Sequence, residues 1–243
     1  MRTMELPLML QRLRQAGLWD HFFEYVDADA WTKLSADAGS SVALDADWVG
    51  GGVTLTTGGT DNNECALKST VEAFKFAANQ PILFAAMATW AEANTDDLNI
   101  MFGLMDAIGA NAMLDNGAGP KTTFSGAVIY KKDGDTVWSV RSSIGTTYTD
   151  TQTSQACHSA STQVTLAIYC MPRSSTEIDI VFYMDPAGGA NLQPLTDSRG
   201  NVIKHTVTLG SPTEMNAGVY VKAGGANSEV VTLDMLGAEQ VLF

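Results

Sequence analysis

The chain has 243 residues and a formal net charge of −13, with 45% hydrophobic and 17% charged residues. This composition excludes intrinsic disorder, which requires few apolar residues and many charges. The acidic body excludes a nucleic-acid binder that works through general electrostatics, because it would repel phosphate. The sequence contains no apolar run of about 18 residues, so we expect no membrane-spanning helix.

The cysteines and the N-terminal stretch indicate where the chain folds. Cys65, Cys157 and Cys170 form an odd, sparse set without a C-x-x-C pair. They predict neither a disulfide framework nor a zinc or redox motif, and we expect buried free thiols. The first apolar run is short and is closed by Arg12 and Arg14, unlike a signal peptide. We therefore expect synthesis and folding in a cytoplasm.

Charge divides the chain into an N-terminal arm, residues 1–17, and a body, residues 18–243. The first 16 residues contain three arginines and one glutamate, so the arm is basic while the body is acidic. Apolar residues recur in the arm at helical spacing, which predicts a short amphipathic helix over residues 6–16. Its apolar stripe packs either on its own body or on a neighbouring subunit.

From about residue 40 the sequence has the character of β-structure. Alternating apolar residues over 82–90 favour a strand, and segment 98–106 is apolar on both faces, like a central strand. The clearest hairpin joins 125–132 to 136–141 through Asp133 and Gly134. Further strands are expected at 50–59, 62–70, 163–170, 177–184, 205–209, 218–222 and 229–235. About ten short strands between turns predict an all-β fold, an antiparallel β-sandwich or jelly roll.

The strongest catalytic candidate is the pair Glu177 and Asp179. Two residues apart in a strand, their side chains point to the same side. The segment resembles the Glu-x-Asp-x-(x)-Glu strand of retaining glycosidases with a concanavalin-type jelly roll, which need a second carboxyl group about 5–5.5 Å away. That position holds Val181, or Phe182 if the strand bulges. The pattern agrees with the fold and argues against hydrolysis, so we expect no enzymatic activity.

Acidic loops contain the candidate ligands for a metal ion. Calcium binds carboxylate and amide oxygens, but the spacing here matches no EF-hand, and such residues usually serve as solvated turns or strand caps. The candidates are Asp96, Asp97, Asn99 and Asp106, with Asp115 and Asn116 as further ones. We expect no cofactor, and calcium is the cation to test.

Several segments between residues 60 and 236 resemble tailed-bacteriophage virion proteins with a concanavalin A-like, lectin-like jelly roll. They are 64–69, 74–82, 92–106, 115–120, 125–138 and 216–234. The resemblance implies a non-enzymatic structural protein of the virion, a capsid decoration or cement protein on the capsid surface that assembles in the host cytoplasm. It also implies the major capsid protein and sister copies as partners in a homo-oligomer, with a trimer favoured.

In this interpretation the arm and the aromatic segment after it bury surface against other subunits. Burial of apolar area contributes about 25 cal/mol per Å² before ordering costs are subtracted. The expected contact residues are Leu6, Leu10, Arg12, Leu13, Arg14, Trp19, Phe22 and Phe23.

The alternative function is a lectin-like carbohydrate-binding module on a virion fibre or capsid surface. Such a module requires an exposed aromatic ring next to hydrogen-bonding groups, with or without calcium. Trp48, Trp90 and Trp138 lie in apolar or alternating contexts, so we expect at least two of them in the core. A glycan is thus the alternative partner, and neither nucleic acid nor a membrane is expected.

Overall fold

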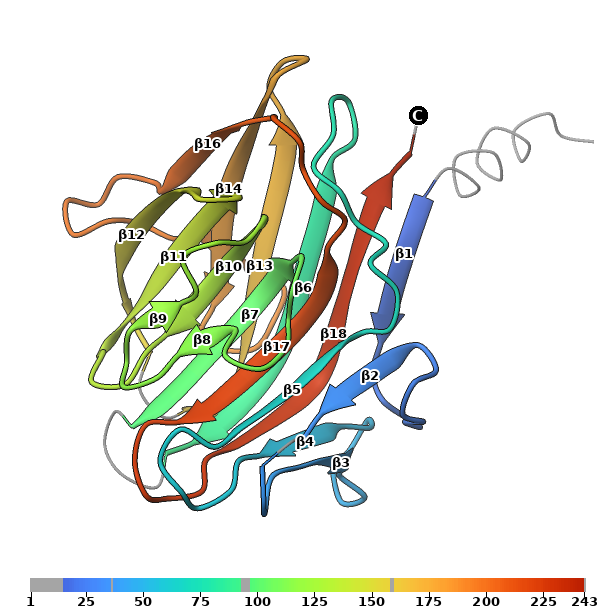
Figure 1. Cartoon of the computed structure of the whole chain (residues 1–243), viewed down its shortest axis with the longest axis vertical. Helices are drawn as coiled ribbons and strands as arrows, with labels where there is room; N and C mark the ends of the chain where they lie inside the picture. Colours follow the sequence, from blue (N-terminus) through green and yellow to red (C-terminus); the bar gives the residue numbers. More distant parts are fainter. Residues whose placement is uncertain (1–14, 36, 93–96, 158–159, 243) are drawn as a thin grey trace, which may run out of the picture.

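The computed structural model of the chain describes residues 15–35, 37–92, 97–157 and 160–242. Two antiparallel sheets are stacked on each other, and a small hairpin lies on one of them (Figure 1). The described residues form strands, turns and bends. No helix among them has the length and apolar character needed to cross a membrane.

Nine strands form the larger sheet. In spatial order they are β15 (Gln193–Pro194), β14 (Glu177–Asp185), β13 (Ala160–Pro172), β6 (Ile82–Ala91), β18 (Val230–Val241), β4 (Val53–Thr56) and β3 (Ser41–Leu44). Two strands lie off this path: β16 (Lys204–Thr208) pairs with β14, and β1 (Gln15–Asp20) pairs with β18.

Seven strands form the other sheet. Their order is β12 (Thr147–Ala156), β11 (Val137–Ile144), β10 (Gly126–Lys131), β7 (Leu98–Met105), β17 (Asn216–Ala223), β5 (Glu64–Ser69) and β2 (Trp31–Leu34). The separate hairpin consists of β8 (Met113–Leu114) and β9 (Gly119–Pro120).

The core lies between the two sheets, and β7 shows how the sequence builds it. Ile100, Phe102 and Leu104 point into the large cluster that fills the sandwich. The alternate residues Met101 and Met105 belong to a second apolar cluster, because successive side chains of a strand point to opposite faces. β7 is therefore buried along its whole length, as its two apolar faces predicted.

The second cluster lies on the outer face of the seven-stranded sheet and needs a cover. Residues 106–125, which we call the covering loop, run between β7 and β10 and carry the hairpin of β8 and β9. Ile108, Met113 and Phe124 of this loop pack against the methionines of β7. The loop thus turns one sheet face into a second core.

The predicted antiparallel β-sandwich is confirmed. Each segment expected to be a strand contains one, and the three cysteines are buried thiols outside any disulfide, as predicted. The described residues form eighteen strands, whereas the sequence predicted about ten. Most of the missed strands are short, and β12 was missed because its sequence is almost entirely polar.

The N-terminal segment differs from the predicted helix over 6–16 at its last two residues. Gln15 and Ala16 belong to β1 and pair with Val241 and Gln240 of β18. β18 pairs with β4 only up to Leu233, so its far half offers an edge that β1 completes. The expected boundary between residues 17 and 18 falls inside this strand. Leu6, Leu10, Arg12, Leu13 and Arg14 lie outside the described residues.

Candidate functional site

Three strands, β11, β12 and β16, lie together at one edge of the sandwich (Figure 1). A cleft of about 300 Å³ is lined by residues of these strands and of the adjoining turns. We call it the edge cleft. Its volume falls at the lower end of the range of about 300–1,000 Å³ for small-molecule sites. Its lining includes five residues with aliphatic hydroxyl groups, Ser142, Thr147, Thr149, Thr206 and Thr208. Ile144, Tyr148, Val207 and Gly210 complete the lining.

The hairpin itself is built by a two-residue turn. Ile144 pairs with Thr147, and Gly145 between them has φ 60°. A positive φ at the first turn residue favours glycine and suits the twist of a tight hairpin. Alternation along β12 then places Thr147 and Thr149 on the inner face and Tyr148 on the outer face. The hairpin therefore offers hydroxyls on one side of the edge strand and an aromatic ring on the other.

Tyr148 is held in place from behind by a cation. The guanidinium carbon of Arg141 lies 4.6 Å from the centre of the Tyr148 ring, within range of a cation–π interaction. Arg141 Nε donates to Asp150 Oδ2 at 2.9 Å, and its Nη1 donates to the carbonyl oxygen of Pro120 at 2.7 Å. Tyr148 keeps 46% of its surface exposed, so a pre-positioned ring faces solvent at the rim of the edge cleft.

Both carboxylate oxygens of Asp150 accept hydrogen bonds from neighbouring side chains. It accepts from Arg141, and Tyr130 Oη donates to its Oδ1 at 2.8 Å. Burial, followed by the charge of Asp150, raises the pKa of Tyr130, so this phenol remains a donor at neutral pH. The carboxylate is therefore used to hold Arg141 and the hairpin.

His205 ties the two sheets together behind the edge cleft. Its Nδ1 hydrogen bonds with Ser142 Oγ at 2.9 Å and its Nε2 with Thr151 Oγ1 at 3.0 Å. Burial lowers the pKa of His205 from its ordinary 6.5 to about 4, although the charge of Asp150 opposes the shift. A neutral imidazole thus joins β16 to β11 and β12 at pH 7.

Comparison with known proteins defines the fold. No family model and no curated protein sequence matches the chain. The exoplasmic/lumenal domain of VIP36 in its Ca²⁺/Man3GlcNAc-bound form matches at 13% identity and a TM-score of 0.55, over 88% of this chain and 84% of that one. Peanut lectin with a nine-residue peptide matches at 10% identity and a TM-score of 0.57, over 94% of this chain and 98% of that one. An endo-1,3-β-glucanase from Streptomyces sioyaensis matches at 12% identity and a TM-score of 0.58, over 95% of this chain and 98% of that one.

The fold is a lectin-like jelly roll. At such low identities the likeness establishes the architecture alone. Two of these three proteins are named for carbohydrate binding or as a lectin and one is named as an enzyme, so the fold is shared by binding and hydrolytic proteins. None of the three is a bacteriophage protein, and the resemblance to virion proteins gains no support from them.

Four oxygen atoms surround the side-chain nitrogen of Lys222, in an arrangement that resembles the ligands of a metal ion; we call it the oxygen cage. Lys222 Nζ lies 2.9 Å from Asn111 Oδ1, 2.9 Å from Met113 O and 2.6 Å from Asp115 Oδ1. Glu64 Oε2 completes the cage at 3.3 Å. Carboxylate, amide and backbone oxygens are the ligands that calcium takes. Here the ammonium of a buried lysine already holds the centre, so the residues present do not fit a bound calcium ion.

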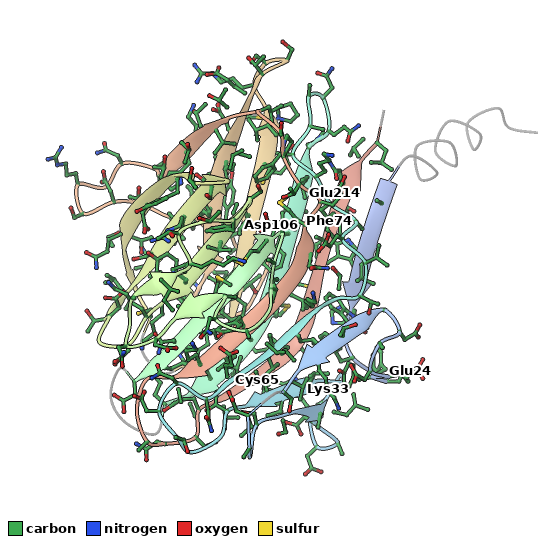
Figure 2. All side chains as sticks on the ribbon, in the orientation of Figure 1. Glu24, Lys33, Cys65, Phe74, Asp106 and Glu214 are labelled. Atoms are coloured by element: carbon green, nitrogen blue, oxygen red, sulfur yellow. The ribbon has the colours of Figure 1, made fainter. Side chains whose placement is uncertain are left out.

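The four calcium candidates from the sequence do not converge on one ion. Asp96 lies outside the described residues. Asn99 Oδ1 accepts from the Asp133 backbone N–H at 2.9 Å, whereas Asp106 Oδ2 accepts from Thr213 at 2.9 Å beyond the far end of β7 (Figure 2). Seven residues at about 3.3 Å each place these two about 23 Å apart.

Asp97 remains near Asn99. Its backbone oxygen accepts from the Gly224 N–H at 2.8 Å. Within the described ranges, no group of three or more His, Cys, Asp or Glu side chains is arranged to hold a metal ion.

The aromatic residues singled out from the sequence divide into buried and exposed ones. Trp90 and Trp138 pack edge to face in the core with centroids 5.4 Å apart, which confirms that at least two tryptophans are core residues. Phe22 was expected to contact a partner, but it is buried against Trp31 at 5.8 Å. The turn after β1 directs this ring inward.

Trp19 and Phe23 remain at the surface, with 41% and 81% of their area exposed. They are the described residues of the expected contact set that a partner can reach.

Glu177 and Asp179 lie on the same face of β14, as predicted, because Ile178 and Ile180 point into the core. Asp179 Oδ1 accepts from Thr206 at 2.7 Å and its Oδ2 from Lys204 at 3.0 Å. Desolvation raises the pKa of Asp179, but these bonds outweigh it and lower the pKa below its usual range. The group is ionised at neutral pH and is unsuited to donate a proton.

The sequence analysis missed both β12 and His205. The signal for β12 was the alternation of threonines at 147, 149, 151 and 153, since β-branched residues favour strands even where no apolar face exists. No local signal pointed to His205, because its partners come from other strands.

Proposed function

We propose that this protein binds carbohydrate, without cleaving it, at the surface formed by the edge cleft and the rim residue Tyr148. The observation that carries the proposal is a half-exposed aromatic ring, pre-positioned on Arg141, beside a cleft lined with hydroxyl groups. The lectin-like fold agrees with this function.

The chemistry of the site matches that of a sugar. A pyranose presents apolar C–H groups on a face and hydroxyl groups around its rim, and an aromatic ring with hydroxyls nearby complements both. Within the part of the chain that the structure describes, the hydroxyls of Thr147, Thr149 and Thr208 make no hydrogen bond to protein. They remain available to a ligand.

Binding is favoured over hydrolysis by the state of two nearby acids, Asp150 and Asp179. Asp150 is occupied by Arg141 and Tyr130. Asp179 is ionised and bonded to Thr206. A glycosidase needs one carboxyl group that keeps its proton and donates it to the leaving group, and neither acid has the environment for that role.

The test is a glycan array followed by calorimetric titration of the strongest ligand. Tyr148→Ala should weaken binding at least about tenfold, or 1.4 kcal/mol, whereas Tyr148→Phe should bind within about twofold of wild type. Phe23→Ala, at an exposed ring away from the cleft, is the matched control and should bind normally. Unchanged binding in Tyr148→Ala, or no binding to any glycan, would remove the proposal.

A second proposal concerns protein partners and rests on the surface around β1. Trp19 and Phe23 are exposed, as is Val26 at 64%. Among the described residues β1 pairs only with β18, so its other edge carries open backbone groups that another chain can use. We propose that this surface binds the major capsid protein and sister copies, placing a homotrimer on a bacteriophage capsid.

Light scattering and co-sedimentation with tailed-phage capsids test this second proposal. A trimeric mass and capsid binding are expected for the wild-type protein. Trp19→Ser combined with Phe23→Ser should lose capsid binding, while Val49→Ser, at an exposed valine in another loop, should keep it. A monomer that never sediments with capsids contradicts the proposal.

A further inference from the structure

None of the described residues that line the edge cleft is charged. Its polar groups come from serine, threonine and tyrosine, and its apolar groups from Ile144 and Val207. The chain as a whole has a net charge of −13. The lack of charge sets limits on the ligands that fit.

Two charged residues beside the lining are paired with each other, and Glu177, opposite Thr208, lies 3.9 Å from Arg173. Arg141, next to Ser142 in β11, forms an ion pair with Asp150, next to Thr149 in β12. The guanidinium also donates to the carbonyl oxygen of Pro120 and is buried beneath Tyr148. It therefore has no exposed edge with which to grip a sulfate or carboxylate in the bidentate way that arginine favours.

The remaining cationic groups around β16 are also committed. Lys204 pairs with Asp179 at 3.0 Å, and Arg173 lies 3.9 Å from the same carboxylate. His205 is neutral at pH 7 because burial lowers its pKa to about 4. An anionic sugar at the edge cleft would meet no unpaired cation among these residues and would also be repelled by the acidic body.

The two faces of β12 set the length of the ligand. The hydroxyls of Thr147 and Thr149 lie on the inner face of this edge strand, while the Tyr148 ring lies on the outer face against Arg141. Tyr148 also lines the cleft, but a ligand that stacks on its ring and bonds to the threonine hydroxyls has to pass around the edge of the strand, which favours several linked sugars over a single ring.

Resting on the proposed carbohydrate binding, we propose that the ligand is an uncharged oligosaccharide that wraps around the edge strand β12. Its hydroxyls bond to the free threonine hydroxyls in the cleft, and one of its rings stacks on Tyr148. Because no charge is neutralised, the affinity is independent of salt. Because contacts lie on both faces, the affinity rises with chain length.

The experiment compares neutral and anionic probes at two salt concentrations. The neutral probes are manno-, cello- and malto-oligosaccharides of one to six units, and the anionic probes are oligogalacturonides and heparin oligosaccharides. A neutral series should bind, with affinity rising at least about tenfold from monomer to tetramer, and with a Kd that changes less than about twofold between 20 and 500 mM NaCl.

Two variants locate the contacts. Thr149→Val removes one hydroxyl at nearly constant volume and should weaken binding of the tetramer about threefold to tenfold while the protein remains folded by circular dichroism. Thr196→Val, which removes a hydroxyl outside the edge cleft, should leave binding unchanged.

The outcomes separate the two proposals. Binding of anionic probes alone, weakened by salt, overturns the neutral ligand and keeps carbohydrate binding. Equal affinity for one and four sugar units overturns the wrapped geometry. No binding to either class removes the proposed function itself, and the present inference with it.

Discussion

Lys222 Nζ lies 2.9 Å from the carbonyl oxygen of Met113, so a charge carried by β17 holds the covering loop onto the seven-stranded sheet. Arg141 acts in the same way from β11, through the carbonyl oxygen of Pro120. The loop between these two carbonyls carries the hairpin of β8 and β9. Two protein cations thus fix the cover of the second core.

Replacing Lys222 should be strongly destabilising. Lys222→Met keeps the length of the side chain but leaves the buried carboxylate of Glu64 without its cation. Breaking a buried pair in this way costs about 3–5 kcal/mol, which urea unfolding measures. Lys75→Met is the control, because Lys75 and Glu214 form an exposed pair at 2.9 Å and such pairs contribute about 0–1 kcal/mol. Similar losses in both variants would show that the cage adds no special stability.

Calcium and chelator should leave the stability of the wild-type protein unchanged. A ligand raises the melting temperature only if it binds the folded state, and Lys222 already fills the oxygen cage. Calorimetric melting in 5 mM CaCl₂ and in 5 mM EDTA is expected to agree within about 1 °C. A clear rise with calcium would reveal a cation site elsewhere in the chain.

Phe22 and Phe23 should respond to mutation in opposite ways despite being neighbours. Phe22→Ala removes a buried ring that packs on Trp31 and should cost about 3–5 kcal/mol of unfolding free energy. Phe23→Ala should stay within about 0.5 kcal/mol of wild type, since the ring is exposed. Denaturant titration measures the free energy of unfolding of both variants. Equal decreases in that free energy would contradict the burial pattern.

Acid should weaken the fold through His205. The folded pKa of about 4 lies below the ordinary 6.5, so the unfolded chain binds more protons between these values. The free energy of unfolding therefore keeps its full value above pH 6.5. It decreases as the pH falls from 6.5 toward 4, by about 3 kcal/mol in total.

The measurement compares the free energy of unfolding at pH 7.0, 6.0 and 5.0 for the wild type and for His205→Gln. Glutamine keeps a hydrogen-bonding side chain for Ser142 and Thr151 but does not titrate. The variant should lose less stability over this interval than the wild type. Identical slopes would mean that His205 titrates in the folded protein as it does in the unfolded chain.

The sandwich was predictable because its signals are local. The alternation over 82–90 and the two apolar faces of 98–106 correspond to β6 and β7, and the Asp133-Gly134 turn joins β10 to β11. Each of these patterns reports burial within a few residues of itself. The strand β12 was not predicted because an edge strand with polar residues on both faces has no apolar period.

By itself the sequence determined that two antiparallel sheets would enclose one apolar core, because period-two burial and turn residues are encoded residue by residue. Only the tertiary structure decided which polar groups meet. Lys222 donates hydrogen bonds to Asn111 and Met113, which are more than a hundred residues away in the sequence. His205 forms a hydrogen bond with Ser142 across the sandwich. Such contacts depend on the register of distant strands and on charges that burial forces to pair, and no local pattern carries that information.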